Sequence, residues 1–332
     1  MVSTYALGTM TFGAETDEAG SFAQMDAFVE AGGTLVDTAD VYSGGESEAI
    51  IGRWLSQRPR DVTERVVLAT KGRFPMGPDA NDVGLSRRHL RRALRASMRR
   101  LGVEHVDLYQ VHAWDPLTPL EETVAAIGDE IRAGLVSYWG LSNYTGWQLA
   151  AACATADALS VPRPVTLQPQ YNLLAREIEW EVVPAAEYHG LGLLPWSPLG
   201  GGWLTGKYRR DSAPEGATRL GENPARGVEA YAKRAARQRT WDVLDALAAL
   251  AEENGTSMGA TALAWLQTRP AMTSVILGAR TLEQLLANLD AVAVTLTAAQ
   301  VARLDEASDP SPADYPYGTA GADQRSRVLP GG

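Results

Sequence analysis

The chain has 332 residues, of which 45% are hydrophobic, and its formal net charge is −10 at pH 7. This composition suits a globular enzyme with a packed core, and the acidic balance argues against a nucleic-acid or anionic-membrane surface. A single cysteine, Cys153, rules out an internal disulfide. Neither a secretory signal nor an apolar run long enough to span a bilayer is evident, so we expect a cytoplasmic protein.

Apolar, β-branched runs alternate with helical patterns at roughly thirty-residue intervals, which is typical of repeated βα units. The predicted strands end near Thr9, Asp37, Thr70, Val111, Gly140, Gln168, Leu194 and Leu277. Helices are predicted between or after these strands, among them 86–101, 119–133 and 281–292. This count predicts an α/β fold, a single (β/α)8 TIM barrel.

The helix predicted over 86–101 shows how such a unit is encoded. Ser86 can cap its start and Gly102 can end it. Its apolar positions are Leu85, Leu90, Leu94, Met98 and Leu101. Arginines occupy most of the other positions, and they could indicate a nucleic-acid site. We favour a solvated helix face instead, because arginines on the surface of an acidic protein need no ligand.

The interval between the seventh and eighth predicted strands is about eighty residues, far longer than the others, so it holds an insertion. Its first part, rich in Gly, Arg and Pro, predicts a long loop over the barrel mouth, followed by helices at about 239–253 and 257–268. From Pro310 onward Pro and Gly are again dense. We therefore predict a barrel domain over 1–308 and an irregular tail over 309–332.

Four chemically useful side chains lie at, or a few residues beyond, the ends of three successive predicted strands: Asp37, Tyr42, Lys71 and His112. In a parallel barrel, side chains at the carboxyl ends of different strands converge on one mouth. Taken alone, Asp37 could be a cap and Lys71 a solvated residue at a strand end. Together, an acid, a phenol, an amine and an imidazole predict a site for proton transfer.

Eight motifs resemble those of one family, in the order in which that family carries them. They are GTMTFG, DTADVYSGGESE, ATKG, DLYQVHAWD, GLSNY, LQPQYNLL, PWSPLGGGWLTGKY and ILGARTLEQLLANL, and they run from about residue 7 to 290. The chain resembles the bacterial aldo-keto reductases, which are related to the channel beta-subunit-like branch. The resemblance implies NADPH-dependent reduction of an aldehyde or ketone to an alcohol. Tyr42 would donate the proton, Lys71 would lower the pKa of Tyr42, Asp37 would keep Lys71 charged, and His112 would orient the carbonyl.

The same resemblance implies the cofactor contacts. Ser142, Asn143 and Gln168 would bind the nicotinamide carboxamide, Trp196 would stack on its ring, and Arg280 would favour NADPH over NADH by holding a 2′-phosphate. Further cofactor contacts are expected at Gly8, Thr9, Met10, Asp37, Ser197, Pro198, Leu199, Gly201, Lys207, Gly278, Gln284 and Asn288. No metal site is expected, because no cluster has metal-ligand spacing.

The substrate is expected to be a small carbonyl compound, but its identity stays open. Candidate pocket residues are Phe12, Tyr42, His112, Trp114 and Tyr144, with Trp203, Tyr315 and Tyr317 as further candidates. Aromatic walls suit aryl aldehydes, sugars and polycyclic ketones about equally.

Two other functions remain open at this point. One is an NADPH-binding sensor or regulatory subunit with little turnover, since the resemblance extends to channel-associated subunits. The other is an unrelated barrel isomerase or lyase, which the fold alone would allow. Family members usually carry a hairpin that plugs the barrel floor, yet only MVSTYA precedes LGTMTFG. Unless another segment covers it, we expect an exposed apolar floor and some tendency to self-associate.

Overall fold

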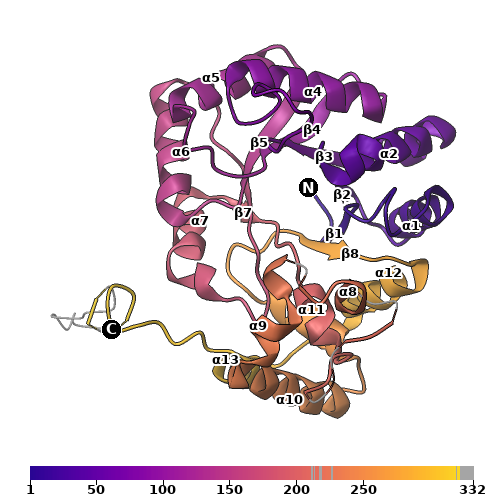
Figure 1. Cartoon of the computed structure of the whole chain (residues 1–332), viewed down its shortest axis with the longest axis vertical. Helices are drawn as coiled ribbons and strands as arrows, with labels where there is room; N and C mark the ends of the chain where they lie inside the picture. The colour runs from indigo at the N-terminus through magenta and orange to yellow at the C-terminus, as the bar shows by residue number, and fades with distance from the viewer. Residues whose placement is uncertain (211, 213, 217–218, 226, 319, 322–332) are drawn as a thin grey trace.

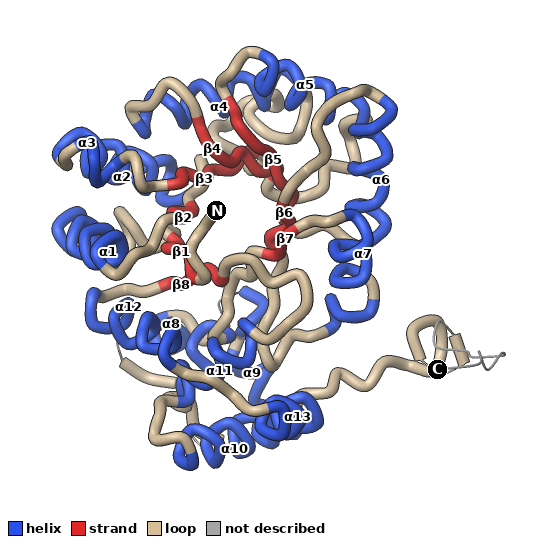
Figure 2. The backbone as a smooth tube through the Cα atoms, turned by 180° about the vertical axis from the view of Figure 1, so that it is seen from behind, coloured by secondary structure: helices blue, strands red, loops and turns tan. Residues whose placement is uncertain are grey.

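The computed structural model describes residues 1–332 except 211, 213, 217–218, 226, 319 and 322–332. Parallel strands form a ring at the centre of the molecule (Figure 2). They are β1 (Tyr5–Gly8), β2 (Leu35–Asp37), β3 (Val67–Gly72), β4 (Val106–Val111), β5 (Val136–Ser142), β6 (Thr166–Gln168), β7 (Gly192–Leu193) and β8 (Val275–Gly278). The strand order is β7-β6-β5-β4-β3-β2-β1-β8. The predicted (β/α)8 barrel is therefore confirmed.

The two strands at the ends of the strand order, β7 and β8, are connected by backbone hydrogen bonds of the segments beside them. Leu193 donates its N–H to the carbonyl of Ala271 at 2.8 Å, and Ile276 donates to the carbonyl of Pro195 at 3.0 Å. The two ends of the sheet are thus linked through the segments that flank β7 and β8, which leaves the barrel nearly closed.

The helices surround the ring (Figures 1 and 2). They are α1 (Glu18–Glu30), α2 (Glu46–Gln57), α3 (Arg60–Thr63), α4 (Arg87–Leu101), α5 (Leu120–Arg132), α6 (Gly146–Ala158), α7 (Val182–His189), α8 (Arg219–Glu222), α9 (Tyr231–Ala235), α10 (Gln238–Glu253), α11 (Met258–Gln267), α12 (Leu282–Leu289) and α13 (Ala298–Ala307). Short 3-10 turns are η1 (Tyr42–Gly45), η2 (Glu177–Trp180), η3 (Gly200–Thr205), η4 (Gly227–Glu229) and η5 (Asp290–Ala293). The helix expected over 281–292 is thus divided into α12 and η5.

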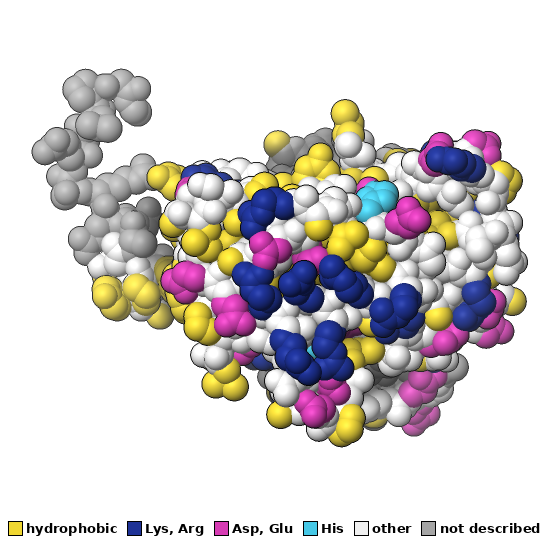
Figure 3. Space-filling model, turned by 90° about the horizontal axis from the view of Figure 1, so that it is seen from above, with side chains coloured by type: hydrophobic (Ala, Val, Ile, Leu, Met, Phe, Trp, Pro, Cys, Tyr) yellow, Lys and Arg dark blue, Asp and Glu magenta, His cyan; other side chains and the backbone are white. Residues whose placement is uncertain are grey.

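Helix α4 begins and ends where its caps predict. The Ser86 hydroxyl accepts a hydrogen bond from the N–H of His89, and Gly102 has a left-handed φ of 67°. Arginines gather on the outer face over α4 and α5, interspersed with acidic side chains (Figure 3). Arg91 and Arg95 each lie 3.0 Å from the buried carboxylate of Glu130. The arginine stripe is therefore partly neutralised by the neighbouring helix.

The lower part of the barrel interior is apolar. Its buried cluster consists of Ala6, Leu35, Ala69, Leu108, Leu194 and Ile276. Val2 packs against this cluster, and the N-terminus lies inside the ring in Figure 2. The six side chains are at most 7% exposed, so the expected exposed floor is not observed for them. Tyr138, which pairs with Leu108 in the sheet, is 59% exposed.

The insertion after β7 holds more structure than a loop. Trp203 is fully buried, and its ring stacks on that of Tyr231 with centroids 5.4 Å apart. Glu229 and Arg234 form a buried ion pair at 2.9 Å. Trp203 donates its indole N–H to the carbonyl of Glu229 at 3.0 Å. Trp203, considered above as a pocket wall, thus lies in the core of the insertion.

Beyond α13 the described residues 309–318 and 320–321 contain no helix or strand, and this segment leads away from the barrel in Figure 1. Tyr317 stacks on Trp180 with ring centroids 5.7 Å apart. Among the described residues, no helix is both long and apolar enough to cross a membrane.

Candidate active site

The barrel topology brings the four candidate side chains to one mouth. Asp37 ends β2, Lys71 is next to last in β3, His112 follows β4 and Tyr42 opens η1. In the parallel register Asp37 pairs with Ala69, and Lys71 pairs with Gln110. Because side chains alternate along a strand, the polar side chains form a layer above the apolar one.

Lys71 is the centre of this layer. Its side chain is fully buried, and Nζ donates to Oδ2 of Asp37 at 2.6 Å, to the carbonyl of Thr38 at 2.8 Å and to Oη of Tyr42 at 3.2 Å. Burial acts to lower the pKa of Lys71, but the carboxylate of Asp37 and the oxygen of Tyr42 outweigh it and raise that pKa. The ammonium therefore stays charged.

The phenol of Tyr42 is held in its neutral form. Burial raises its pKa, the charge of Lys71 acts against that rise, and the carboxylate of Asp37 adds to it. The lowering that we expected from Lys71 is thus outweighed in this structure. A neutral phenol is the form that can donate a proton, so this balance suits Tyr42 as an acid.

His112 is held as a neutral imidazole. Burial, followed by the positive charges of Lys71 and Arg73, lowers its pKa to about 2. Its ring meets that of Tyr42 edge-on at 5.9 Å and that of Phe74 at 4.7 Å. The buried Nδ1 has no hydrogen-bond partner among the described residues. A neutral imidazole can act as a hydrogen-bond donor to a substrate oxygen, but it carries no charge at neutral pH.

Gln110 is a site residue that sequence reasoning missed. Oδ1 of Asp37 accepts hydrogen bonds from Nε2 of Gln110 at 3.0 Å and from Nε2 of Gln168 at 2.9 Å. Both amides are buried. A signal was available, because Gln110 stands two residues before His112 and therefore faces the same side of β4. Asp37 is consequently fixed by three donors, one of them Lys71.

Three residues expected at the nicotinamide are connected by hydrogen bonds, and one of them, Asn143, contacts His112 directly. Asn143 donates its amide to the carbonyl of His112 at 3.0 Å, and the indole of Trp196 donates to Oδ1 of Asn143 at 3.0 Å. Ser142 donates its hydroxyl to the carbonyl of Gln168 at 3.0 Å. Asn143 has a left-handed φ of 55°. Non-glycine residues in this conformation cluster at functional sites.

Several residues of the loop after β7 have a left-handed backbone conformation. Ser197, Gly201 and Gly202 all have left-handed φ values, of 54°, 64° and 96°. A Cβ built on Gly202 would stand 2.5 Å from Nζ of Lys207, so the Lys207 ammonium lies over this loop. Pro198 is buried and Leu199 is half-buried beside it. The N–H groups of Gly200 and Gly202 donate to the carbonyls of Ser197 and Leu199 within the loop, so the ammonium of Lys207 is the group here that best suits a phosphate.

Residues expected at the adenosine end lie at the end of β8, in the loop that follows it and in α12. Nη2 of Arg280 donates to both carboxylate oxygens of Glu222, at 2.7 and 2.9 Å. The backbone N–H of Arg280 donates to Oε1 of Gln284 at 2.9 Å, and Asn288 lies one turn further along α12. Gly278 ends β8, where a Cβ would meet no atom within 4 Å. Space is therefore available beside this strand end.

The cofactor contacts expected at the end of β1 and just beyond it differ in their exposure. Gly8 and Thr9 are fully packed: a Cβ on Gly8 would stand 2.6 Å from Cγ2 of Ile276, and the Thr9 hydroxyl bonds the carbonyl of Asp37 at 3.1 Å. Met10 is 38% exposed. Only Met10 of the three offers much side-chain surface to a ligand.

Comparison with known proteins identifies the family. The family model described as "Aldo/keto reductase family" matches residues 5–309. The chain belongs to this family. It is 39% identical over 304 residues to "Uncharacterized oxidoreductase YrpG" of Bacillus subtilis, covering 89% of each chain. It is 37% identical over 301 residues to "Probable voltage-gated potassium channel subunit beta" of Arabidopsis thaliana, covering 88% of each chain.

A third relative carries an activity in its name. The chain is 31% identical over 293 residues to "Probable aryl-alcohol dehydrogenase AAD4" of Saccharomyces cerevisiae, covering 86% of each chain. This aldo/keto reductase is thus an oxidoreductase by family, and the alternative of an unrelated barrel isomerase or lyase is excluded.

The aromatic residues considered for the substrate pocket of this aldo/keto reductase differ in access. The rings of Trp114 and Tyr144 meet edge-on at 5.4 Å, and Trp147 continues this group at 5.3 Å from Trp114. Phe12 has no exposed surface, whereas Tyr315 is 77% exposed on the C-terminal segment. The Trp114 and Tyr144 pair lies in the loops after β4 and β5, which border the mouth.

A second buried charged group of the reductase lies outside the barrel wall, between the strands and helices α2 and α4. Glu48 is fully buried, pairs with Arg100 at 2.6 Å and accepts from the hydroxyl of Thr70 at 2.5 Å. Burial, together with the negative charge of Glu48, raises the pKa of the buried Asp40 to about 7. Asp40 donates its backbone N–H to the carbonyl of Lys71 at 3.1 Å, which links this group to the mouth.

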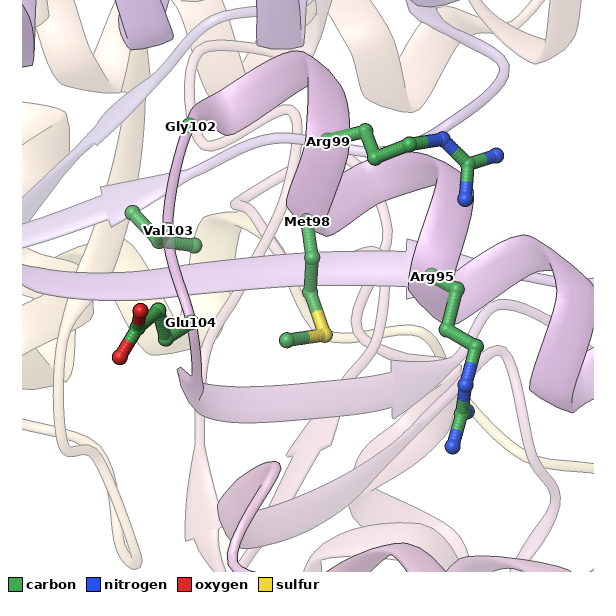
Figure 4. A pocket seen from close by; sticks show the side chains of 6 residues that line it. All are labelled: Arg95, Met98, Arg99, Gly102, Val103 and Glu104. Atoms are coloured by element: carbon green, nitrogen blue, oxygen red, sulfur yellow. The ribbon is translucent and has the colours of Figure 1, made fainter.

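A surface hollow of about 430 Å³ lies at the end of α4, lined by Arg95, Met98, Arg99, Gly102, Val103 and Glu104 (Figure 4). It precedes β4, so it lies at the amino-terminal end of the barrel strands, opposite the mouth. In TIM barrels the active site occupies the carboxyl-terminal face. The hollow is therefore no part of this site.

Proposed function

We propose that this aldo/keto reductase uses NADPH to reduce an aldehyde or a ketone to an alcohol, with Tyr42 as the proton donor. One observation carries the proposal: a single buried ammonium, Nζ of Lys71, contacts both Oδ2 of Asp37 at 2.6 Å and Oη of Tyr42 at 3.2 Å. An acid joined in this way to a fixed positive charge is suited to lose a proton and to have the resulting phenolate stabilised.

When bound, NADPH supplies the hydride that reduces the carbonyl carbon. Tyr42 transfers its proton to the carbonyl oxygen as negative charge develops there. Lys71 stabilises the phenolate that remains, and Asp37 compensates the charge of Lys71. His112, neutral at physiological pH, donates a hydrogen bond that orients the carbonyl. Lys71 contacts both Asp37 and Tyr42, and the ring of Tyr42 lies against that of His112.

The donor set of the mouth fits a dinucleotide. Ser142, Asn143 and Gln168 offer polar groups for the carboxamide beside the indole of Trp196. The loop from Ser197 to Gly202, with the ammonium of Lys207 beside it, is the part of the mouth that we propose for the phosphates. The other residues that we propose for the cofactor site are Gly8, Thr9, Met10, Gly278, Arg280, Gln284 and Asn288. Arg280 suits a 2′-phosphate, which favours NADPH over NADH.

The test compares NADPH oxidation by the wild type and by Tyr42→Phe with a reactive aryl aldehyde. We expect kcat to fall by about a hundredfold or more, because the general acid is lost, while the Kd for NADPH changes little. Tyr188→Phe, which alters an 85% exposed tyrosine of α7, is the matched control and should retain wild-type kcat. Equal kcat values for Tyr42→Phe and the wild type would refute the assignment.

A second candidate function is an NADPH-binding sensor or regulatory subunit with little turnover. Its support is the similarity to the Arabidopsis thaliana protein named as a potassium channel subunit beta. Measuring both the Kd for NADPH and the rate of NADPH oxidation separates the two functions. Tight NADPH binding without oxidation across short aldehydes, aryl aldehydes, keto sugars and quinones favours the sensor, whereas turnover that depends on Tyr42 favours the reductase.

A further inference from the structure

Arg73 lies at the mouth with part of its guanidinium group unpartnered. It directly follows Gly72, the last residue of β3, and its Cζ lies 5.2 Å from the centroid of the Phe74 ring. Its Nη2 makes one long hydrogen bond of 3.4 Å to the carbonyl of Trp114. Its Nε is buried and has no hydrogen-bond partner within the described part of the chain. Buried donors of this kind are uncommon and costly, so each calls for an explanation.

No described carboxylate forms an ion pair with Arg73. Asp115 is the acid of the neighbouring loop, but its oxygens serve other donors. They accept from the N–H of Leu85 at 2.8 Å, from the N–H of Leu117 at 3.0 Å and from the hydroxyl of Thr118 at 2.7 Å. Asp115 therefore shapes its loop, and the positive charge of Arg73 remains uncompensated by a direct partner.

Two more unpartnered polar atoms lie around Arg73. Tyr144 is 4% exposed, and its buried hydroxyl has no partner among the described residues. Burial and, after it, the negative charge of Asp115 raise the pKa of that hydroxyl, and the positive charge of Arg73 acts against the rise. Nδ1 of His112 is the other unpartnered atom. Trp114 contacts Arg73 through its carbonyl and Tyr144 through its ring. The ring of Phe74 contacts both the guanidinium of Arg73 and the ring of His112.

The group formed by Arg73, Phe74, His112, Trp114 and Tyr144 thus combines a cation that pairs with no described carboxylate, a hydroxyl without a described hydrogen-bond partner, and aromatic walls. It lies beside the imidazole that would orient the reacting carbonyl. We propose that Arg73 and Tyr144 form an anion subsite, and that the substrate is a carbonyl compound that also carries a carboxylate. This inference rests on the proposed carbonyl reduction, and it specifies the class of substrate.

The number of donors favours a carboxylate over a phosphate. The planar guanidinium presents its N–H groups as a fork that matches two carboxylate oxygens, and the Tyr144 hydroxyl can add one hydrogen bond. A phosphate dianion would carry more charge than one arginine compensates. The rings of Phe74 and Trp114 further suit an aryl group between the two polar ends.

The experiment measures kcat/KM with NADPH for 3- and 4-carboxybenzaldehyde and for their neutral methyl esters. For the isomer that the wild type reduces more efficiently, kcat/KM for the acid should exceed kcat/KM for its methyl ester by about tenfold or more. This is the size expected of a charge-assisted hydrogen bond. Arg73→Gln should lower kcat/KM for the acid at least about tenfold more than for the ester. Arg73→Lys should recover part of that loss, because it restores the charge without the fork.

Two variants guard against misleading effects of the substitution. Tyr144→Phe removes only the hydroxyl, and it should shift the acid-to-ester ratio in the same direction by a few fold. Arg99→Gln removes an exposed arginine of α4 far from the mouth, seen in Figure 4, and it should leave the ratio unchanged. Thermal unfolding of each variant shows that it is folded. The subsite is refuted if Arg73→Gln and the wild type have the same ratio, or if glyceraldehyde 3-phosphate is preferred to both acids.

A binding measurement separates failure of this inference from failure of the proposed function. Benzoate binding to the enzyme with NADP⁺ can be followed by tryptophan fluorescence. If the wild type reduces neither aldehyde yet binds benzoate, and Arg73→Gln does not, the reductase proposal fails and the anion subsite stands. If the esters are reduced but benzoate binds both proteins equally, the subsite fails and the reductase proposal stands.

Discussion

The guanidinium of Arg280 and the carboxylate of Glu222 are joined by two hydrogen bonds, of 2.7 and 2.9 Å, across 58 residues of sequence. This pair ties α8 of the insertion to the loop between β8 and α12. The side chain of Arg280 is 24% exposed and that of Glu222 is 43% exposed, so the pair contributes no more than about 1 kcal/mol. A bound 2′-phosphate would compete with Glu222 for the same arginine.

Releasing Arg280 from Glu222 should strengthen NADPH binding. For Glu222→Gln we expect the Kd for NADPH to fall by up to about fivefold, the equivalent of a partly exposed ion pair, while the Kd for NADH stays the same. Arg280→Gln should weaken NADPH by about tenfold and NADH little. Quenching of tryptophan fluorescence measures all four constants. Equal changes for both cofactors would exclude a role of Arg280 at the 2′-phosphate.

The buried pair of Lys71 and Asp37 should be strongly non-additive. Asp37→Asn leaves a buried ammonium without its counterion, and we expect it to cost about 3 kcal/mol or more of unfolding free energy. Lys71→Met should abolish most activity. The double variant should be more stable than the sum of the single losses predicts, because neither charge is then left unpaired. Urea unfolding of the four proteins measures this coupling, and simple additivity would contradict it.

Asp40 should make the protein less stable as the pH rises. Burial, followed by the charge of Glu48, raises its pKa to about 7, so the folded state binds a proton that the unfolded state has released at lower pH. Unfolding free energy should therefore fall between about pH 4 and pH 7 and stay low above it. Asp40→Asn should remove this dependence and raise Tm at pH 8, with little effect near pH 4. Asp61→Asn, at an exposed carboxylate, is the control. A wild-type Tm that rises over this pH range along with that of Asp40→Asn would contradict the assignment.

Local sequence signals were sufficient for much of the fold. Ser86 and Gly102 could be read as caps because the groups that they satisfy lie within one turn of them. Strand ends such as Asp37 and Gln168 follow from short apolar runs, and the structure places both at the ends of their strands. The convergence of Asp37, Lys71 and His112 follows from barrel topology, which the count of βα units already implies.

Partners that meet only in the folded chain could not be predicted in this way. Gln110 stands two residues before His112, which indicates the side of β4 that it faces, but the sequence does not show that it donates to Asp37. Glu229 lies in a segment of polar, loop-like composition, yet it is buried with Arg234. Such contacts depend on how the insertion packs in three dimensions, which its amino-acid composition does not predict. Phe12 follows the first strand and was expected to line the pocket, but the structure shows that it is fully buried. Its burial depends on packing that the sequence does not reveal.

Gln110 should act as a positioning residue for Asp37. In Gln110→Leu, Oδ1 of Asp37 loses one of its donors, and we expect kcat to fall roughly tenfold with little change in the Kd for NADPH. Gln110→Glu should be worse, because a second carboxylate would compete for Lys71. Steady-state kinetics and NADPH titrations distinguish this outcome from a general loss of folding, which would weaken cofactor binding as well. Unchanged kcat in Gln110→Leu would show that Lys71 and Gln168 hold Asp37 without it.

We propose that the mouth of this aldo/keto reductase combines a hydride from NADPH with a proton from Tyr42. The most direct test is reduction of an aryl aldehyde with NADPH that carries two deuterium atoms at C4 of the nicotinamide, followed by mass spectrometry of the alcohol. We expect an alcohol with one deuterium on the carbinol carbon, which the wild type forms rapidly and Tyr42→Phe forms at least about a hundredfold more slowly. An alcohol without deuterium, or tight NADPH binding with no alcohol at all, would contradict this proposal.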